Sequence, residues 1–77
     1  MALIVVRAAW DDEARVWYVE DSDVFGVNAE APTLEALRDK LPDVISDVLA
    51  DNDPARLRDD IAVEIIAHAH TRVMATA

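Results

Sequence analysis

The sequence has no cysteine, so disulfide bonds and thiolate metal sites are excluded. Its single glycine, Gly26, cannot build the glycine-rich loop that holds phosphate groups in nucleotide-binding proteins. Basic residues are also few, with 7 against 16 acidic residues and a net charge of -9. Nucleic acids and anionic membranes repel a chain of this charge, so we expect neither direct nucleic-acid binding nor membrane association.

Long apolar runs are absent as well, because none approaches the ~20 residues of a membrane span. Residues 1–7 lack the basic lead-in of a secretory signal, so we expect a cytoplasmic protein. Hydrophobic residues make up 53% of the 77 residues, which predicts a single globular domain over residues 1–77. A domain of this length buries only about 60% of its unfolded surface. Association with another chain is therefore the expected aid to its stability.

The N-terminal part of the sequence predicts three antiparallel strands. Residues 2–10 and 15–20 are rich in β-branched and aromatic side chains, and only about four residues separate them. Such a short connection between two strands is typical of an antiparallel hairpin. A weaker strand is predicted over residues 27–31, and its poor alternation of apolar and polar residues places it at the sheet edge.

A helix is predicted over residues 33–50. Thr33 is a suitable N-cap, and Glu35 places negative charge in the first turn. Pro42 removes one helical hydrogen bond, so we expect a bend near residues 39–41 rather than two separate helices. The apolar stripe of this helix comprises Leu34, Leu37, Leu41, Val44, Ile45, Val48 and Leu49.

A polar connector over residues 51–60 leads to a final strand over residues 61–71, in which the odd positions are apolar. A helix is the alternative, because Ile61, Ile65 and Ala69 also share a helical face. The expected fold class is α+β, in the order β-β-β-α-β. The helix crosses one face of an antiparallel three-stranded meander, and the last strand lies parallel to the first.

Catalytic chemistry has little support in this sequence. The only serines are Ser22 and Ser46, and neither stands in a nucleophile elbow. We therefore expect a protein that is not an enzyme and that needs no cofactor.

Two patterns resemble metal sites, but each is incomplete. His68 and His70 share a strand face with Glu64, but two ligands do not make a site, and two solvent-facing histidines explain the pair better. The run Asp21-x-Asp23-x-x-Gly26 begins like a calcium loop. It then has Phe25 at a ligand position and Pro32 where a bidentate glutamate is required. We expect no metal site.

The second strand is apolar on both faces, since Val16 and Tyr18 alternate with Trp17 and Val19. One helix can cover only one face of the sheet. The other face is either shielded by a loop or forms a contact surface for a second chain, where large aromatic residues are enriched. The predicted partner or dimer interface comprises Trp10, Trp17, Asp21, Asp23, Phe25, Ile66 and His68, with Glu30, Asp43 and Asp47 as an acidic rim.

An ordered series of short motifs resembles the N-terminal domain of HicB-like antitoxins, and more closely its stand-alone branch of largely unknown function. The likeness covers about residues 3–70, with Phe25 where that family usually has proline. The motifs are Trp10-Asp11, Glu13-Ala14-x-Val16-Trp17, Ser22-Asp23-Val24-Phe25-Gly26 and Ala31-Pro32-Thr33-Leu34-Glu35-x-Leu37.

This resemblance implies a partial ribonuclease-H-like sheet and assembly into dimers or larger oligomers. It also implies a small basic toxin that cleaves messenger RNA as the partner. No DNA-binding region is expected after Ala77, so autorepression is not implied. The first hypothesis is an antitoxin-type protein-binding module. The alternatives are a stand-alone homo-oligomeric regulatory or scaffolding domain with no toxin, and, least favoured, a divalent-metal ribonuclease-like enzyme.

Overall fold

The computed structural model describes residues 2–58 and 60–75. Met1, Asp59, Thr76 and Ala77, which belong to the predicted domain 1–77 and its connector, lie outside the described residues. The fold is α+β, as predicted, with one long helix after the third strand. The elements in chain order are β1 (Ala2–Asp11), β2 (Val16–Ser22), β3 (Glu30–Ala31), α1 (Leu34–Asn52), the 3-10 helix η1 (Pro54–Arg58) and β4 (Ile61–His68).

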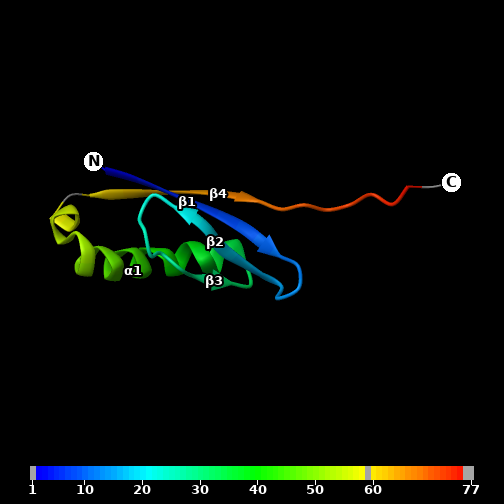
Figure 1. The fold of residues 1–77 in the computed structure, drawn as a ribbon, viewed down its shortest axis with the longest axis horizontal. Coiled ribbons are helices and arrows are strands. Elements are labelled where there is room, and N and C mark those ends of the chain that lie inside the picture. The colour runs from blue at the N-terminus through cyan, green and yellow to red at the C-terminus, as the bar shows by residue number, and fades with distance from the viewer. Residues whose placement is uncertain (1, 59, 76–77) are drawn as a thin grey trace.

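The four strands form one mixed sheet in the order β3-β2-β1-β4. Strands β1, β2 and β3 pair antiparallel, whereas β4 pairs parallel with β1 along all eight of its residues (Figure 1). The apolar first strand is therefore central, and β3 and β4 are the two edges. This arrangement confirms the predicted meander and the predicted position of the last strand.

Helix α1 covers one face of the sheet and closes the core. Thr33 caps its first turn by accepting a hydrogen bond from the Ala36 N–H at 3.0 Å. The helix then continues through Pro42 as one helix rather than two, as predicted, and the bend expected near residues 39–41 stays a prediction. The core between sheet and helix comprises Ile4, Val6, Ala8, Val24, Val27, Ala31, Leu37, Leu41, Ile45 and Leu49.

Several predicted boundaries were wrong. The second strand covers residues 16–22 rather than 15–20. The third has two residues rather than 27–31, because Val27 is buried in the core and residues 23–29 form a loop. The last strand ends at His68 rather than at residue 71, because Ala9 is the final β1 residue that pairs with it. The connector also contains η1, which the sequence analysis did not predict.

Residues 69–75 continue from β4 without regular structure and extend away from the body (Figure 1). Val73 in this arm is 95% exposed. The arm makes the molecule elongated, with a longest extent of 59 Å.

Candidate protein-binding surfaces

The loop after β2 presents an aromatic side chain directly to solvent. Phe25 is 94% exposed, although Val24 and Val27 on either side of the turn are buried in the core. Gly26 allows this turn because its φ is 92°, a backbone angle that L side chains rarely adopt. The buried valines thus fix the loop while Phe25 points outward, which is the arrangement expected of a contact residue.

Asp23 anchors the same loop to the sheet. Its backbone N–H donates to the Val5 carbonyl at 3.0 Å, and its carboxylate accepts a hydrogen bond from the Val5 N–H at 2.9 Å. The carboxylate of Asp23 therefore has a structural role. Asp21 is exposed and lies opposite Arg7 in the β1–β2 register.

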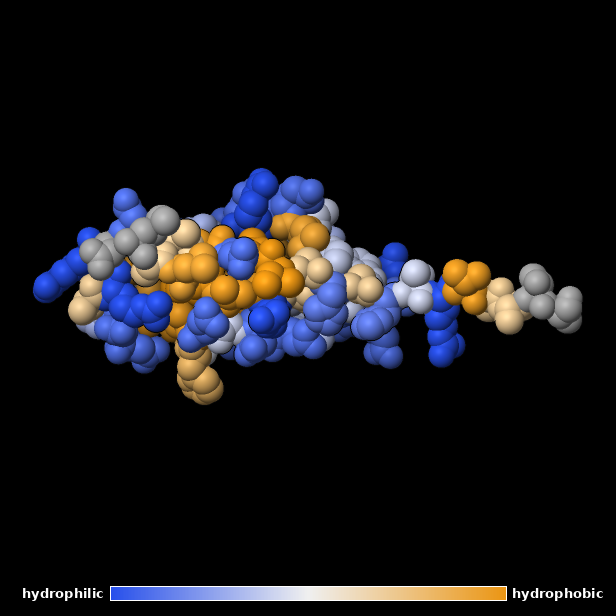
Figure 2. Space-filling model, turned by 90° about the horizontal axis from the view of Figure 1, so that it is seen from above, coloured by the Kyte–Doolittle hydropathy of each residue, from blue (hydrophilic) through white to orange (hydrophobic). Residues whose placement is uncertain are grey.

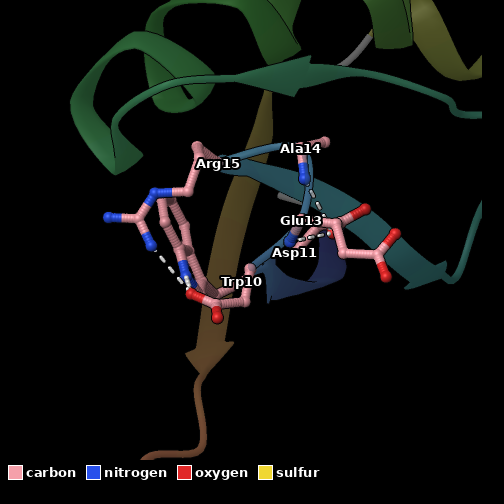
Figure 3. Close-up of polar contacts among 6 residues, drawn as sticks. Trp10, Asp11, Glu13, Ala14 and Arg15 are labelled. Carbon is pink, nitrogen blue, oxygen red and sulfur yellow. Dashed lines mark hydrogen bonds and ion pairs between the residues drawn. The ribbon is translucent and has the colours of Figure 1, made fainter.

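The two tryptophans lie together at the turn between β1 and β2. The ring centroids of Trp10 and Trp17 are 5.4 Å apart and the rings are tilted by 57°. The Arg15 guanidinium lies 5.2 Å from the Trp10 ring centroid and forms an ion pair with Asp12 at 2.8 Å (Figure 3). Arg15 adopts a φ of 59°, so these contacts hold a non-glycine residue in the left-handed region.

Asp11 stabilises the backbone of this turn. Its Oδ1 accepts hydrogen bonds from the N–H groups of Glu13 and Ala14, at 3.0 and 3.1 Å (Figure 3). Beside the turn, a shallow hollow separates the tryptophans from the start of α1. It is lined by Trp10, Trp17, Pro32, Thr33, Leu34, Glu35 and Ala69.

The predicted interface residues do not form one continuous patch. Trp10 and Trp17 lie at one end of β2, whereas Asp21, Asp23 and Phe25 lie at its other end. Asp23 lies six positions after Trp17 along the extended chain, which corresponds to roughly 20 Å. Ile66 and His68 belong to a third region, on β4.

That third region is the sheet face turned away from α1. Figure 2 views this face and shows hydrophobic residues gathered over its centre with hydrophilic residues around them. Ile66 is 40% exposed here. The apolar residues that the register places on this face are Leu3, Val5, Ala9, Val16, Tyr18, Ala62 and Ile66.

A polar contact crosses one end of this open face. His68 Nε2 lies 2.5 Å from Glu20 Oε2, so the pair reaches from β4 over β1 to β2. Glu20 is available because the β1–β2 register shifts between Arg7 and Ala8 and leaves Glu20 as an extra residue on β2. Beneath the pair Ala9 is only 5% exposed. His68 was predicted from the sequence as an interface residue, whereas its contact with Glu20 was not predicted.

A groove between α1 and β4 was not predicted. It consists of two adjoining hollows that share Arg38 and Ile65, the larger of about 340 Å³. Strand β4 turns alternate apolar side chains toward the helix, of which Ile61, Val63 and Ile65 are only half-buried and Ala67 is exposed. The α1–β4 groove is lined by Leu34, Glu35, Arg38, Leu41, Pro42, Ile45, Ser46, Leu57, Ile61, Val63, Ile65 and Ala67.

Acidic side chains surround these surfaces. Asp43 and Asp47 are exposed along α1, and Glu30 is exposed on β3, where its carbonyl accepts a hydrogen bond from Lys40 Nζ at 2.6 Å.

The rings of His68 and His70 are 6.0 Å apart in an edge-on arrangement. Within residues 2–58 and 60–75, no three histidine, aspartate or glutamate side chains lie close enough together to hold a metal ion.

These observations define a small α+β domain in which, over the part of the chain that the structure describes, a helix covers one face of the sheet and no helix covers the other. The match to known sequences is more specific. A family model described as a domain of unknown function, DUF1902, matches residues 3–77, and the chain belongs to this family.

A solved structure shares the fold. The chain is similar to the hypothetical protein TTHA1013 from the extremely thermophilic bacterium Thermus thermophilus, with 36% sequence identity and a TM-score of 0.67. The alignment covers 94% of this chain and 97% of that chain. No protein with a curated description matches the sequence.

Neither comparison carries the name HicB, so the HicB-like resemblance stays a prediction. Among the described residues, no helix is both long enough and apolar enough to cross a membrane.

Proposed function

We propose that this protein is a non-catalytic protein-binding module of the antitoxin type, which binds a small basic RNA-cleaving toxin in the cytoplasm. The observation that carries the proposal is Phe25. Its ring is almost fully exposed on a loop that Val24, Val27 and Asp23 fix to the core. An aromatic side chain held in this way loses little conformational entropy on binding and contributes a large apolar area.

The charge of the molecule supports a basic partner. The chain carries a net charge of -9, and Asp21 is exposed close to Phe25 in the sequence. Helix α1 lies next to this loop, because Val48 Cγ1 is 3.8 Å from the position a Cβ would take on Gly26. Asp47 precedes Val48 on the exposed side of α1. Opposite charge would increase the rate of association and the specificity for a basic protein more than the affinity.

The resemblance to HicB-like antitoxins supports the class of partner. The motif Ser22-Asp23-Val24-Phe25-Gly26 is one of those that carry the resemblance, and it contains the exposed ring. Within this motif Ser22 ends β2, Val24 is buried in the core and Phe25 is exposed.

The test uses the product of the gene adjacent to the one that encodes this protein. We expect that gene to encode a short basic protein whose RNA cleavage is suppressed by an excess of the unmodified chain. Phe25→Ala should weaken this suppression by at least about tenfold, the effect of losing one buried aromatic contact. Its folding stability should stay within about 0.5 kcal/mol of the unmodified protein, because the side chain is exposed.

Val73→Ala is the matched control, since Val73 is equally exposed but lies on the arm. It should suppress cleavage as well as the unmodified chain does. Cleavage that continues at excess protein, or an adjacent gene that encodes no short basic protein, would contradict the toxin-binding function.

A stand-alone homo-oligomeric regulatory or scaffolding domain is the second candidate. The observation that favours it is strand β4, which is an edge of the sheet and borders the α1–β4 groove. This second function predicts that the chain associates with itself and has no effect on the ribonuclease activity of the adjacent gene product.

A further inference from the structure

Strand β4 is an edge of the sheet, and no strand of the described ranges, 2–58 and 60–75, pairs with its outer side. The Ala2 N–H donates to the Asp60 carbonyl at 3.1 Å, which shows that residue 60 turns its backbone groups toward β1. Backbone groups alternate in direction along a strand. The odd-numbered residues of β4 therefore point their N–H and C=O groups outward, away from β1: Ile61, Val63, Ile65 and Ala67.

The side chains of the same four residues face α1. Ile61, Val63 and Ile65 pack against the core but stay half-buried, and all of them line the α1–β4 groove. Leu57 borders the groove from η1 and is 40% exposed. One edge of the molecule thus combines free backbone hydrogen-bonding groups with an incompletely covered apolar layer, which together favour pairing with a further strand.

We propose that this further strand is β4 of a second copy of the chain, paired antiparallel across a two-fold axis at Ile65. Two chains that each carry a net charge of -9 repel each other over most of their surfaces, so two copies can associate only where acidic residues are few. The β4 edge is such a place. Strand β4 has only one acidic residue, Glu64, and no lysine or arginine. At the groove, Arg38 forms an ion pair with Asp39 at 3.4 Å, which offsets its charge near the axis.

The positions of the helices and the charge of Glu64 select the register. Pairing odd-numbered residues with odd-numbered ones keeps both α1 helices on the same side of the joined sheet and brings the two grooves together. Of the two such registers nearest the strand centre, one places Glu64 directly opposite Glu64 of the second copy, which is unfavourable. The other centres on Ile65 and places Glu64 opposite Ile66 of the second copy.

In the Ile65 register, Val63 pairs with Ala67 of the second copy, and Ile61 pairs with Ala69. The strand would then extend to Ala69, which has no β1 partner in the single chain. The strand predicted to continue beyond His68 would thereby gain a pairing partner at Ala69. The resulting eight-stranded sheet has β3 at both ends and no free β4 edge.

Cross-linking tests the register directly. The natural chain has no cysteine, so Ile65→Cys introduces a single thiol. Directly opposed residues of a hydrogen-bonded antiparallel pair have Cα atoms about 5.5 Å apart, within the span of a disulfide. Oxidation should convert most of this variant to a covalent dimer. Glu30→Cys, on the opposite edge strand β3, is the control: it should run at the mass of one chain on a denaturing gel, with no covalent dimer.

A proline substitution tests the edge itself. Ala67→Pro removes an N–H that points outward, so the single chain should keep its fold while the dimer dissociation constant rises at least about tenfold. Ala62→Pro removes an N–H that faces β1 and should destabilise the fold instead. Circular dichroism reports the fold, and light scattering reports the mass.

A dimer that tolerates Ala67→Pro, or an Ile65→Cys variant that cross-links no more than Glu30→Cys, would overturn the proposal. Neither result depends on a toxin, so failure of this inference and failure of the proposed function are distinguishable.

Discussion

At the scale of single residues, a few side chains hold the loops of this glycine-poor chain in place. Arg15 takes a left-handed backbone conformation that usually falls to glycine, and its contacts with Trp10 and Asp12 accompany that conformation. Asp23 fastens the Phe25 loop through both its backbone and its carboxylate. Side-chain contacts therefore hold the Arg15 turn without glycine, and in the Phe25 loop they add to the turn that Gly26 allows.

Arg15 offers a test of this view with two variants. Arg15→Gly loses an exposed ion pair and a cation–π contact but relieves backbone strain of about 1 kcal/mol, so its free energy of unfolding should change by less than about 0.5 kcal/mol. Arg15→Ala loses the same contacts without the relief and should be less stable by about 1 kcal/mol. Urea unfolding followed by tryptophan fluorescence compares the two. A glycine variant that is less stable than the alanine variant would show that the backbone at this position is unstrained.

At the scale of elements, α1 forms as one helix although Pro42 lies inside it. Proline has no N–H, so the Arg38 carbonyl has no helical donor, and the ring also crowds that carbonyl. The apolar side of α1 is buried on both sides of the proline, at Leu37 and Leu41 and again at Ile45 and Leu49. Burial against the sheet thus outweighs the local cost.

Pro42→Ala should therefore raise the free energy of unfolding, by about 1 to 3 kcal/mol. Thermal and urea unfolding measure the change. Asp43→Ala, at the adjacent exposed position, is the control and should change stability by less than about 1 kcal/mol. Equal effects of the two substitutions would mean that the helix accommodates proline without cost.

Much of this element-level structure was predictable. Thr33 and the apolar stripe correctly predicted α1, and the β-branched runs correctly predicted the order of the strands and the central place of β1. The predicted ends of the strands were less accurate, because pairing with a neighbouring strand decides where a strand ends. Strand β4 ends at His68, whose partner Ala9 is the last residue of β1 that pairs with β4.

The surfaces were harder to predict for a related reason. The contact between His68 and Glu20 depends on an extra residue in β2, and alternation of residue types does not reveal such a register shift. The α1–β4 groove depends on where the helix crosses the sheet, which leaves β4 incompletely covered. Phe25 was selected from the sequence as a candidate contact residue, and the structure places its ring in solvent.

At the scale of the whole molecule, α1 covers one face of a sheet that has apolar residues on both faces and that ends at the edge strand β4. A 77-residue domain built in this way has a small core, and a second chain would bury the edge that the helix leaves open. The proposed toxin contact at Phe25 and the proposed dimer contact at β4 lie on separate parts of the surface, so one chain could make both contacts at once.

Sedimentation equilibrium of the unmodified chain tests the need for a second chain most directly. Over the micromolar range, we expect the mass to rise toward twice the 8.5 kDa of one chain as concentration increases. A mass that stays at 8.5 kDa throughout that range would contradict the account.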